Sequence, residues 1–181
     1  GATFKNLTVE GAINIKSKTS YGGIAVEGYG RFDNVTTKVG ISAMVEDSFN
    51  SVGVSQGCFI AKATNTCSFV NCKNESSITV VTQGESAPTQ GETGFGGFIG
   101  FATSASITFD KCFNNASVTS IEPRISVGGF VGASTNTNLS FSSCDNTAIV
   151  IGGSSNNQHC GAGGFVGTVT GGSLTIKNCN N

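Results

Sequence analysis

Few residues of the chain have types and spacing that could support catalysis. Nucleophilic catalysis needs a base beside a Ser or Cys, and the one histidine, His159, stands next to Cys160 in a loop rich in Gly, Ser and Asn. Among the 11 Asp and Glu residues, only Asp33 and Asp110 share a position in the repeat described below. A carbohydrate-processing site would need carboxylates grouped on one face. We therefore predict no catalytic residues and no enzymatic activity.

The 7 Cys residues are the other candidates for chemistry. They lack the CxxC spacing of zinc sites and redox motifs, and their number indicates an oxidising compartment. Four of them recur at one repeat position: Cys72, Cys112, Cys144 and Cys179. A reduced, buried column is the favoured interpretation, with a disulfide ladder or a metal ladder as alternatives. Outside this column stand three possible disulfide partners, Cys58, Cys67 and Cys160. We predict no cofactor.

Five triplets of the N-x-S/T form are possible N-glycosylation sites. They begin at Asn6, Asn34, Asn74, Asn115 and Asn138. Such triplets are typical of a secreted glycoprotein, although a chain this rich in Asn, Ser and Thr also produces them by chance. They are consistent with an extracellular or cell-surface location.

The elements that would position these residues follow from an internal repeat. Residues 128–150 read GGFVGASTNTNLSFSSCDNTAIV, and residues 96–118 read GGFIGFATSASITFDKCFNNASV with identical spacing. Other copies begin at Gly57, one residue shorter in the middle, and at Gly163. Two degenerate copies precede these. One anchor position advances by steps of 28, 37, 40, 32 and 35 through Leu7, Val35, Cys72, Cys112, Cys144 and Cys179.

Within each copy, apolar residues alternate with polar ones at period 2, which indicates short strands. Such units cannot bury an apolar face alone, so they stack. We therefore predict one all-β domain over residues 1–181, a parallel β-solenoid (β-helix) of about five coils with loop insertions. Its coils are degenerate in residues 1–56 and regular in residues 57–181.

Stacking in register predicts columns of like residues. An inward-facing core column comprises Phe59, Phe98, Phe130 and Phe165, beside the Cys column. A corner ladder, whose amides can bond the turn backbone and one another, comprises Asn74, Asn114, Asn146 and Asn181. The paired glycines before each Phe predict a tight bend or a close backbone approach.

The pattern GGFVG, a spacer, then I/L-x-F/I-x-x-C-x-N-x-A-x-V resembles the GLUG-type repeat, and the likeness is clearest from Gly57 to Asn181. That repeat occurs in tandem in large secreted and cell-surface proteins, including adhesin-like ones. The resemblance implies a repeat architecture and a surface location. It brings no catalytic residues with it.

Charge and hydropathy exclude some partners. The formal net charge is -1 and no basic run occurs, so nothing favours nucleic acid or an anionic membrane. No apolar stretch approaches 18 residues, so membrane insertion is not expected. The chain starts at Gly1 without a signal peptide, which is expected of a mature or excised segment.

The matching phase of ATFKNL at the start and LTIKNCNN at the end predicts strands that can pair with another copy. The leading hypothesis is a non-enzymatic extracellular structural protein that assembles head to tail into a surface filament or forms part of an adhesin stalk. A carbohydrate-binding or carbohydrate-processing β-helix is the alternative. Ice binding is a minor one, suggested by a Thr column of Thr64, Thr103, Thr135 and Thr170 with T-x-T pairs at Thr66 and Thr137.

Overall fold

The computed structural model describes residues 1–15, 19–45, 53–82, 93–120, 125–153 and 161–181. These six stretches are called repeats 1 to 6 below. The described residues form strands and no helix, which confirms the all-β class. No helix in this part of the chain is long and apolar enough to span a membrane.

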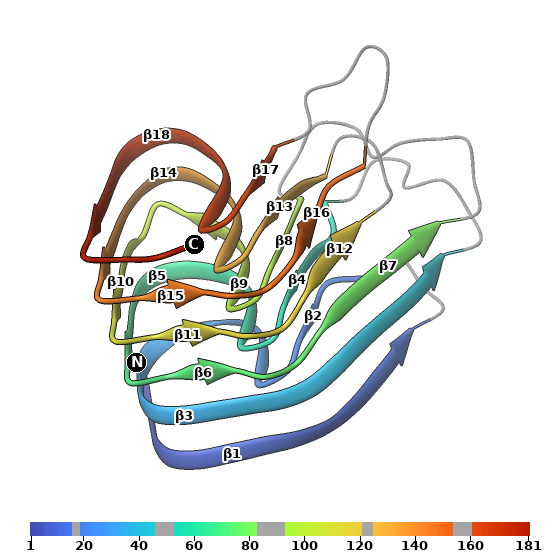
Figure 1. Ribbon diagram of the computed structural model, residues 1–181, viewed down its shortest axis with the longest axis horizontal. Helices are drawn as coiled ribbons and strands as arrows, with labels where there is room; N and C mark the ends of the chain where they lie inside the picture. Colours follow the sequence, from blue (N-terminus) through green and yellow to red (C-terminus); the bar gives the residue numbers. More distant parts are fainter. Residues whose placement is uncertain (16–18, 46–52, 83–92, 121–124, 154–160) are drawn as a thin grey trace.

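The strands follow the repeats in chain order (Figure 1). Repeat 1 is β1 (Ala2–Ile15), and repeat 2 holds β2 (Tyr21–Gly22) and β3 (Ala25–Val45). Repeat 3 holds β4 (Ser55–Gly57), β5 (Ile60–Val70), β6 (Lys73–Asn74) and β7 (Ile78–Thr82). Repeat 4 holds β8 (Gly94–Gly96), β9 (Ile99–Thr103), β10 (Ser106–Asp110), β11 (Phe113–Asn114) and β12 (Val118–Ser120). Repeat 5 holds β13 (Ser126–Gly128), β14 (Val131–Ser142), β15 (Asp145–Asn146) and β16 (Val150–Ile151), and repeat 6 holds β17 (Ala162–Gly163) and β18 (Val166–Lys177).

Each repeat pairs in parallel with the next one along the chain. The register has the offsets of the sequence repeat, because Phe109 pairs with Phe69 and Phe141, and Leu7 pairs with Val35. Among the described residues the pairs form a 13-stranded sheet and a 5-stranded sheet of order β17-β13-β8-β4-β2. The pairing therefore stacks the repeats in chain order, with β1 and β18 at opposite ends (Figure 1).

A left-handed residue bends the chain immediately before every anchor position. This corner column consists of Asn6, Asn34, Asn71, Lys111, Ser143 and Asn178, whose φ angles lie between 51° and 54°. Asn tolerates this conformation better than most residues, because its short polar side chain can bond locally. The sharp corner thus lies one residue before the Cys column, while β6, β11 and β15 end at the Asn ladder.

Two columns of Phe fill the main core. The first holds Phe59, Phe98, Phe130 and Phe165, and the second holds Phe32, Phe69, Phe109 and Phe141, all buried. Rings within a column stack, as Phe109 does on Phe69 at 4.9 Å and on Phe141 at 4.7 Å. Rings of different columns meet edge to face, as Phe98 and Phe109 do at 5.5 Å. Both geometries are favourable for aromatic pairs, so the two columns act as one packed unit.

A second, smaller apolar cluster lies between the two sheets and contains Phe95, Val118 and Val127. One polar residue interrupts it. The register places Gln56 between Tyr21 and Phe95, and its buried Oε1 atom has no hydrogen-bond partner. A buried polar atom without a partner costs stability.

Replacing Gln56 by Leu should therefore raise the free energy of unfolding by about 1 kcal/mol. The control is Thr137→Val, because the buried Thr137 hydroxyl donates to the Thr135 carbonyl at 2.9 Å and its loss should destabilise. Chemical denaturation of both variants checks the prediction. A loss of stability in Q56L would show that the Gln56 oxygen is satisfied in solution.

Candidate functional site

The Asn ladder is the most ordered polar feature of the described residues. The Nδ2 atom of Asn74 donates to Oδ1 of Asn114 at 2.7 Å, and Asn114 donates to Asn146 at 2.7 Å. Asn146 donates in turn to Asn181 at 2.8 Å. At the other end, the Thr37 hydroxyl donates to Asn74 Oδ1 at 3.1 Å. Successive hydrogen bonds of one direction polarise one another. The ladder therefore ties repeats 2 to 6 together through the three buried amides of Asn74, Asn114 and Asn146.

The second glycine of each GG pair leaves room for this ladder. A Cβ atom built on Gly97 would lie 2.5 Å from Oδ1 of Asn114, and one on Gly129 would lie 2.5 Å from Oδ1 of Asn146. Both distances are shorter than real Cβ contacts allow. The close approach predicted for the GG pairs is therefore an approach to the Asn amides as well as to the backbone.

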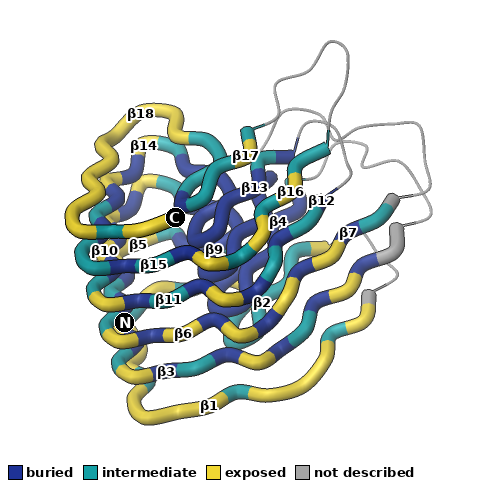
Figure 2. The backbone as a smooth tube through the Cα atoms, in the orientation of Figure 1, coloured by how far each residue is buried: buried dark blue, intermediate teal, exposed yellow. Residues whose placement is uncertain are grey.

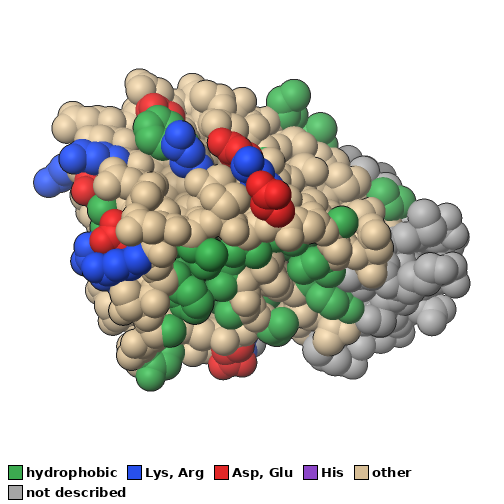
Figure 3. Space-filling model, turned by 90° about the horizontal axis from the view of Figure 1, so that it is seen from below, with side chains coloured by type: hydrophobic (Ala, Val, Ile, Leu, Met, Phe, Trp, Pro, Cys, Tyr) green, Lys and Arg blue, Asp and Glu red, His purple; other side chains and the backbone are tan. Residues whose placement is uncertain are grey.

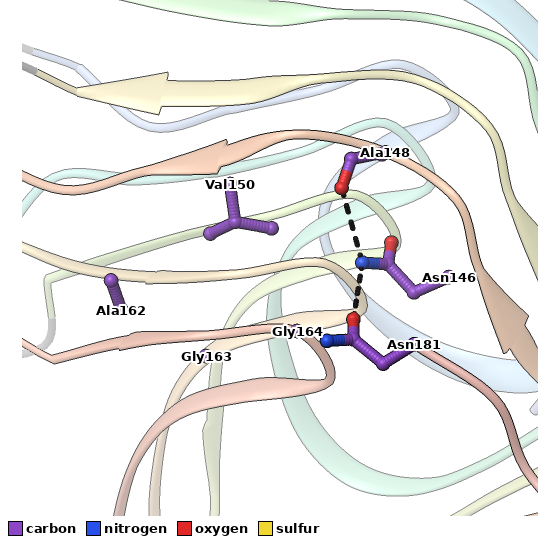
Figure 4. A pocket seen from close by; sticks show the side chains of 7 residues that line it. All are labelled: Asn146, Ala148, Val150, Ala162, Gly163, Gly164 and Asn181. Atoms are coloured by element: carbon purple, nitrogen blue, oxygen red, sulfur yellow. Dashed lines mark hydrogen bonds between the residues drawn. The ribbon is translucent and has the colours of Figure 1, made fainter.

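A pocket of about 200 Å³ lies at the repeat 6 end of the ladder (Figure 4). Asn181 and Asn146 lie on one side of it, and Val150 and Ala162 lie on the other. The Oδ1 atom of Asn181 accepts from Asn146, so its Nδ2 is the next donor of the series. In repeats 3 and 4 the equivalents of Val150, Ile78 and Val118, are fully covered by the repeat above. The pocket thus lies at a layer of the stack that no further described repeat covers.

The Cys column is a row of free thiols. Cys72, Cys112 and Cys144 are buried, Cys179 is half-buried, and none forms a disulfide. The Cys144 amide donates to Cys179 Sγ at 3.3 Å. Burial raises the pKa of the Cys112 thiol, whereas its hydrogen bond to Cys144 lowers the pKa of Cys144 to about 7. The described residues contain no group of three or more His, Cys, Asp or Glu side chains able to hold a metal.

No disulfide joins Cys58 and Cys67, two of the three possible disulfide partners outside the column. Both thiols are free and buried, and they belong to different apolar clusters, Cys67 among the Phe columns and Cys58 beside Phe95. Cys160 lies outside the described residues, as does His159. Cys58 occupies the place of the second glycine in repeat 3, and its side chain contacts Asn74 and Ser76 of the ladder region.

Burial raises the pKa of the Cys58 thiol from its ordinary value of 9.0 to about 12. The folded protein therefore keeps this proton at pH values where the unfolded chain loses it. The stability that the protonated Cys58 thiol contributes to the folded state is fully present below pH 9 and is lost as pH rises toward 12. Between pH 8 and pH 10.5 this thiol should remove about 2 kcal/mol of stability.

Replacing Cys58 by Ala should flatten the alkaline decline in stability by that amount. The measurement is urea unfolding of both proteins at pH 8 and at pH 10.5, under reducing conditions. The Cys179→Ala variant is the control, because the Cys179 thiol is only half-buried and desolvation raises its pKa less than that of Cys58. An equal decline in C58A and in the unmodified protein would contradict the prediction.

The structure separates the five possible glycosylation sites into two groups. Asn74 is fully buried and donates within the ladder, so a glycan cannot attach to it in the folded protein. The other four side chains are exposed: Asn6, Asn34, Asn115 and Asn138. Asn34 and Asn6 share a hydrogen bond of 2.8 Å.

The Thr column does not extend into the flat T-x-T array that ice binding would need. Thr135 and Thr137 lie on either side of Asn136, a left-handed residue with φ of 49°. Thr137 is buried, and the equivalents of the second Thr are Ala105 in repeat 4 and Gly172 in repeat 6. The T-x-T pairs therefore turn a corner.

The strands at the two ends of the stack, β1 and β18, are exposed along most of their length (Figure 2). On β18, Leu174 is 44% exposed and Ile176 is 45% exposed, and on β1, Leu7 is 39% exposed. Figure 3 views the β1 end and shows hydrophobic side chains in its middle, with charged side chains beside them and at the left of the view. Among the described residues, β1 pairs only with β3, and β18 pairs only with β14. Each therefore has one edge available for a further strand.

No family model, no curated protein and no solved structure matches the chain. The similarity to GLUG-type repeats stays a prediction from the quoted residues.

Proposed function

We propose that the chain is a parallel β-solenoid of about five coils with loop insertions, and that it is a non-enzymatic structural protein of the cell exterior. It assembles head to tail into a surface filament or forms part of an adhesin stalk. The observation that carries this proposal is the pair of end strands, each with an unpaired edge and exposed apolar side chains. Backbone hydrogen bonds along such an edge give affinity, and alternate side chains give register.

The columns support an in-register contact between β18 of one copy and β1 of the next. Continuing the offsets would place Ile176 over Phe4, which heads the second Phe column by stacking on Phe32 at 4.9 Å. Cys179 would lie over Leu7. Both pairings are apolar, so the contact would continue the two core columns from one copy into the next.

One pairing in this contact is unfavourable. Lys5 and Lys177 stand at the two ends of one column. Within a copy, Lys5 pairs with Asp33 at the β1 end, and Lys177 pairs with Ser142 at the β18 end. Head-to-tail contact would place Lys177 beside Lys5, and like charges directly opposite each other on paired strands are destabilising. Self-association should therefore strengthen with ionic strength, because salt screens exposed charges.

The test is sedimentation velocity with electron microscopy of the purified protein and of two variants. Ile176→Lys adds a charge to the proposed contact, and Val70→Lys adds one to an outward-facing position in the middle of the stack. We expect filaments in the unmodified protein and in V70K, and monomers in I176K. Monodisperse monomers of the unmodified protein at all concentrations and salt levels would overturn the proposal.

A further inference from the structure

The one place where the register of repeats 2 and 3 breaks forms a pocket on the side of the molecule. Gly28 pairs with Ala63 and Gly30 pairs with Cys67, so the single residue Tyr29 stands opposite residues 64–66. Unpaired residues of this kind bend a strand and re-aim its side chains, and they are frequent beside binding sites. Here they open a pocket of about 350 Å³, which is within the size range of small-molecule sites.

Three repeats contribute to this pocket. Repeat 1 supplies Thr3, repeat 2 supplies Tyr29 and Arg31, and repeat 3 supplies Asn65, Thr66 and Ser68. Thr3, Arg31 and Ser68 are register partners, so their side chains lie on the same face, one above another. Strands are spaced by about 4.8 Å, so this column spans about 10 Å, the length of one or two sugar rings.

The lining is aromatic and polar, and its one charged side chain, Arg31, is paired with Asp33 beside the pocket. Tyr29 is 46% exposed, and its ring offers a flat apolar surface. The Arg31 guanidinium donates to Asp33 at 3.2 Å, so a donor and an acceptor of opposite charge stand side by side. Oδ1 of Asn65 accepts from the Thr66 amide at 2.7 Å, which leaves the Asn65 NH2 group to donate to a ligand.

We infer that this pocket, the Tyr29 pocket, binds a neutral saccharide. A sugar ring has one apolar face, which the Tyr29 ring matches, and a rim of hydroxyls that both donate and accept. The hydroxyls of Thr3, Thr66 and Ser68 and the Arg31–Asp33 pair supply both functions. An anionic ligand is disfavoured because Asp33, which stands beside the pocket, pairs with the Arg31 guanidinium at 3.2 Å.

The column continues as hydroxyls beyond the pocket. Ser68 pairs with Thr108, Thr108 with Ser140, and Ser140 with Thr175. An oligosaccharide anchored in the Tyr29 pocket would therefore meet further hydroxyl groups along the stack. The pocket includes Ala2 and Thr3 of β1, which also forms one side of the proposed contact between copies. Sugar binding is therefore tested on the I176K protein, in which that contact is blocked.

The test is saturation-transfer difference NMR on the I176K protein with cellohexaose, maltohexaose and mannohexaose as neutral probes and trigalacturonic acid as the anionic probe. We expect saturation of at least one neutral probe at millimolar concentration, and loss of most of that signal in Tyr29→Ala and Asn65→Ala. Thr108→Ala, on the same face but outside the pocket, should retain more than half of the signal.

Absence of transfer to all three neutral probes would overturn the inference, as would a signal that persists in Y29A. Preferential binding of trigalacturonic acid would overturn the assignment to a neutral ligand. The proposed assembly is tested by sedimentation alone. Failure of sugar binding and failure of filament formation are therefore distinguishable.

Discussion

Replacing Phe109 by Ala should lower the free energy of unfolding by about 3–5 kcal/mol. Phe109 stacks between Phe69 and Phe141 in its own column, and it meets Phe98 and Phe130 edge to face at 5.5 and 5.4 Å. Truncation would remove these ring contacts from the centre of the stack. The neighbouring rings are fixed by their own stacking, so the cavity cannot collapse easily.

The matched control is Phe113→Ala. Phe113 lies four residues further along the same repeat, but its side chain is half-exposed on β11. We expect F113A to cost less than half as much as F109A in urea denaturation. Equal losses in the two variants would mean that the Phe columns are not the main core.

The second large effect is expected at the Asn ladder. Asn114 accepts from Asn74, donates to Asn146 and donates to the Ala116 carbonyl at 3.3 Å. Asn114→Ala would leave a buried amide donor and a buried amide acceptor without partners, one on each neighbouring repeat. We expect a loss of about 3–5 kcal/mol, because each unsatisfied buried group costs about 1–3 kcal/mol and the truncated side chain leaves a cavity as well.

Asn115 provides the control for this change. It is the next residue, it is exposed, and its Oδ1 accepts only from the Thr147 hydroxyl at 3.1 Å among the bonds of the described residues. Asn115→Ala should change the free energy of unfolding by less than about 1 kcal/mol. If N114A is as mild as N115A, the ladder contributes little and its amides are satisfied by water.

Much of the stacking could be predicted from the sequence, because a register of parallel strands is set by residues that recur at one position. The steps between Cys72, Cys112 and Cys144 are the offsets of the strand pairs. The shorter middle of repeat 3 also appears in the register, where Ala63 pairs with Ala102 but Cys67 pairs with Ile107.

Other features depend on where side chains point, and the recurrence of residue types in the sequence does not reveal that direction. The sharp corner falls on a column of mixed composition, where Lys111 and Ser143 replace Asn, so no single residue type marks it. The contact between Gly97 and Asn114 joins residues 17 positions apart within one repeat, and only the folded path brings them together. The Tyr29 pocket has a sequence signal, because repeat 3 has two more residues than repeat 2 at this place. Its lining, however, depends on three repeats at once.

The most direct test of the assembly is amide hydrogen exchange measured at low and at high protein concentration. If β1 and β18 pair between copies, the amides of Ala2–Ile15 and Val166–Lys177 should become protected as concentration rises, while the amides of Ser106–Asp110 stay unchanged. I176K should show no such increase. Protection of the end strands that does not depend on concentration would contradict the account.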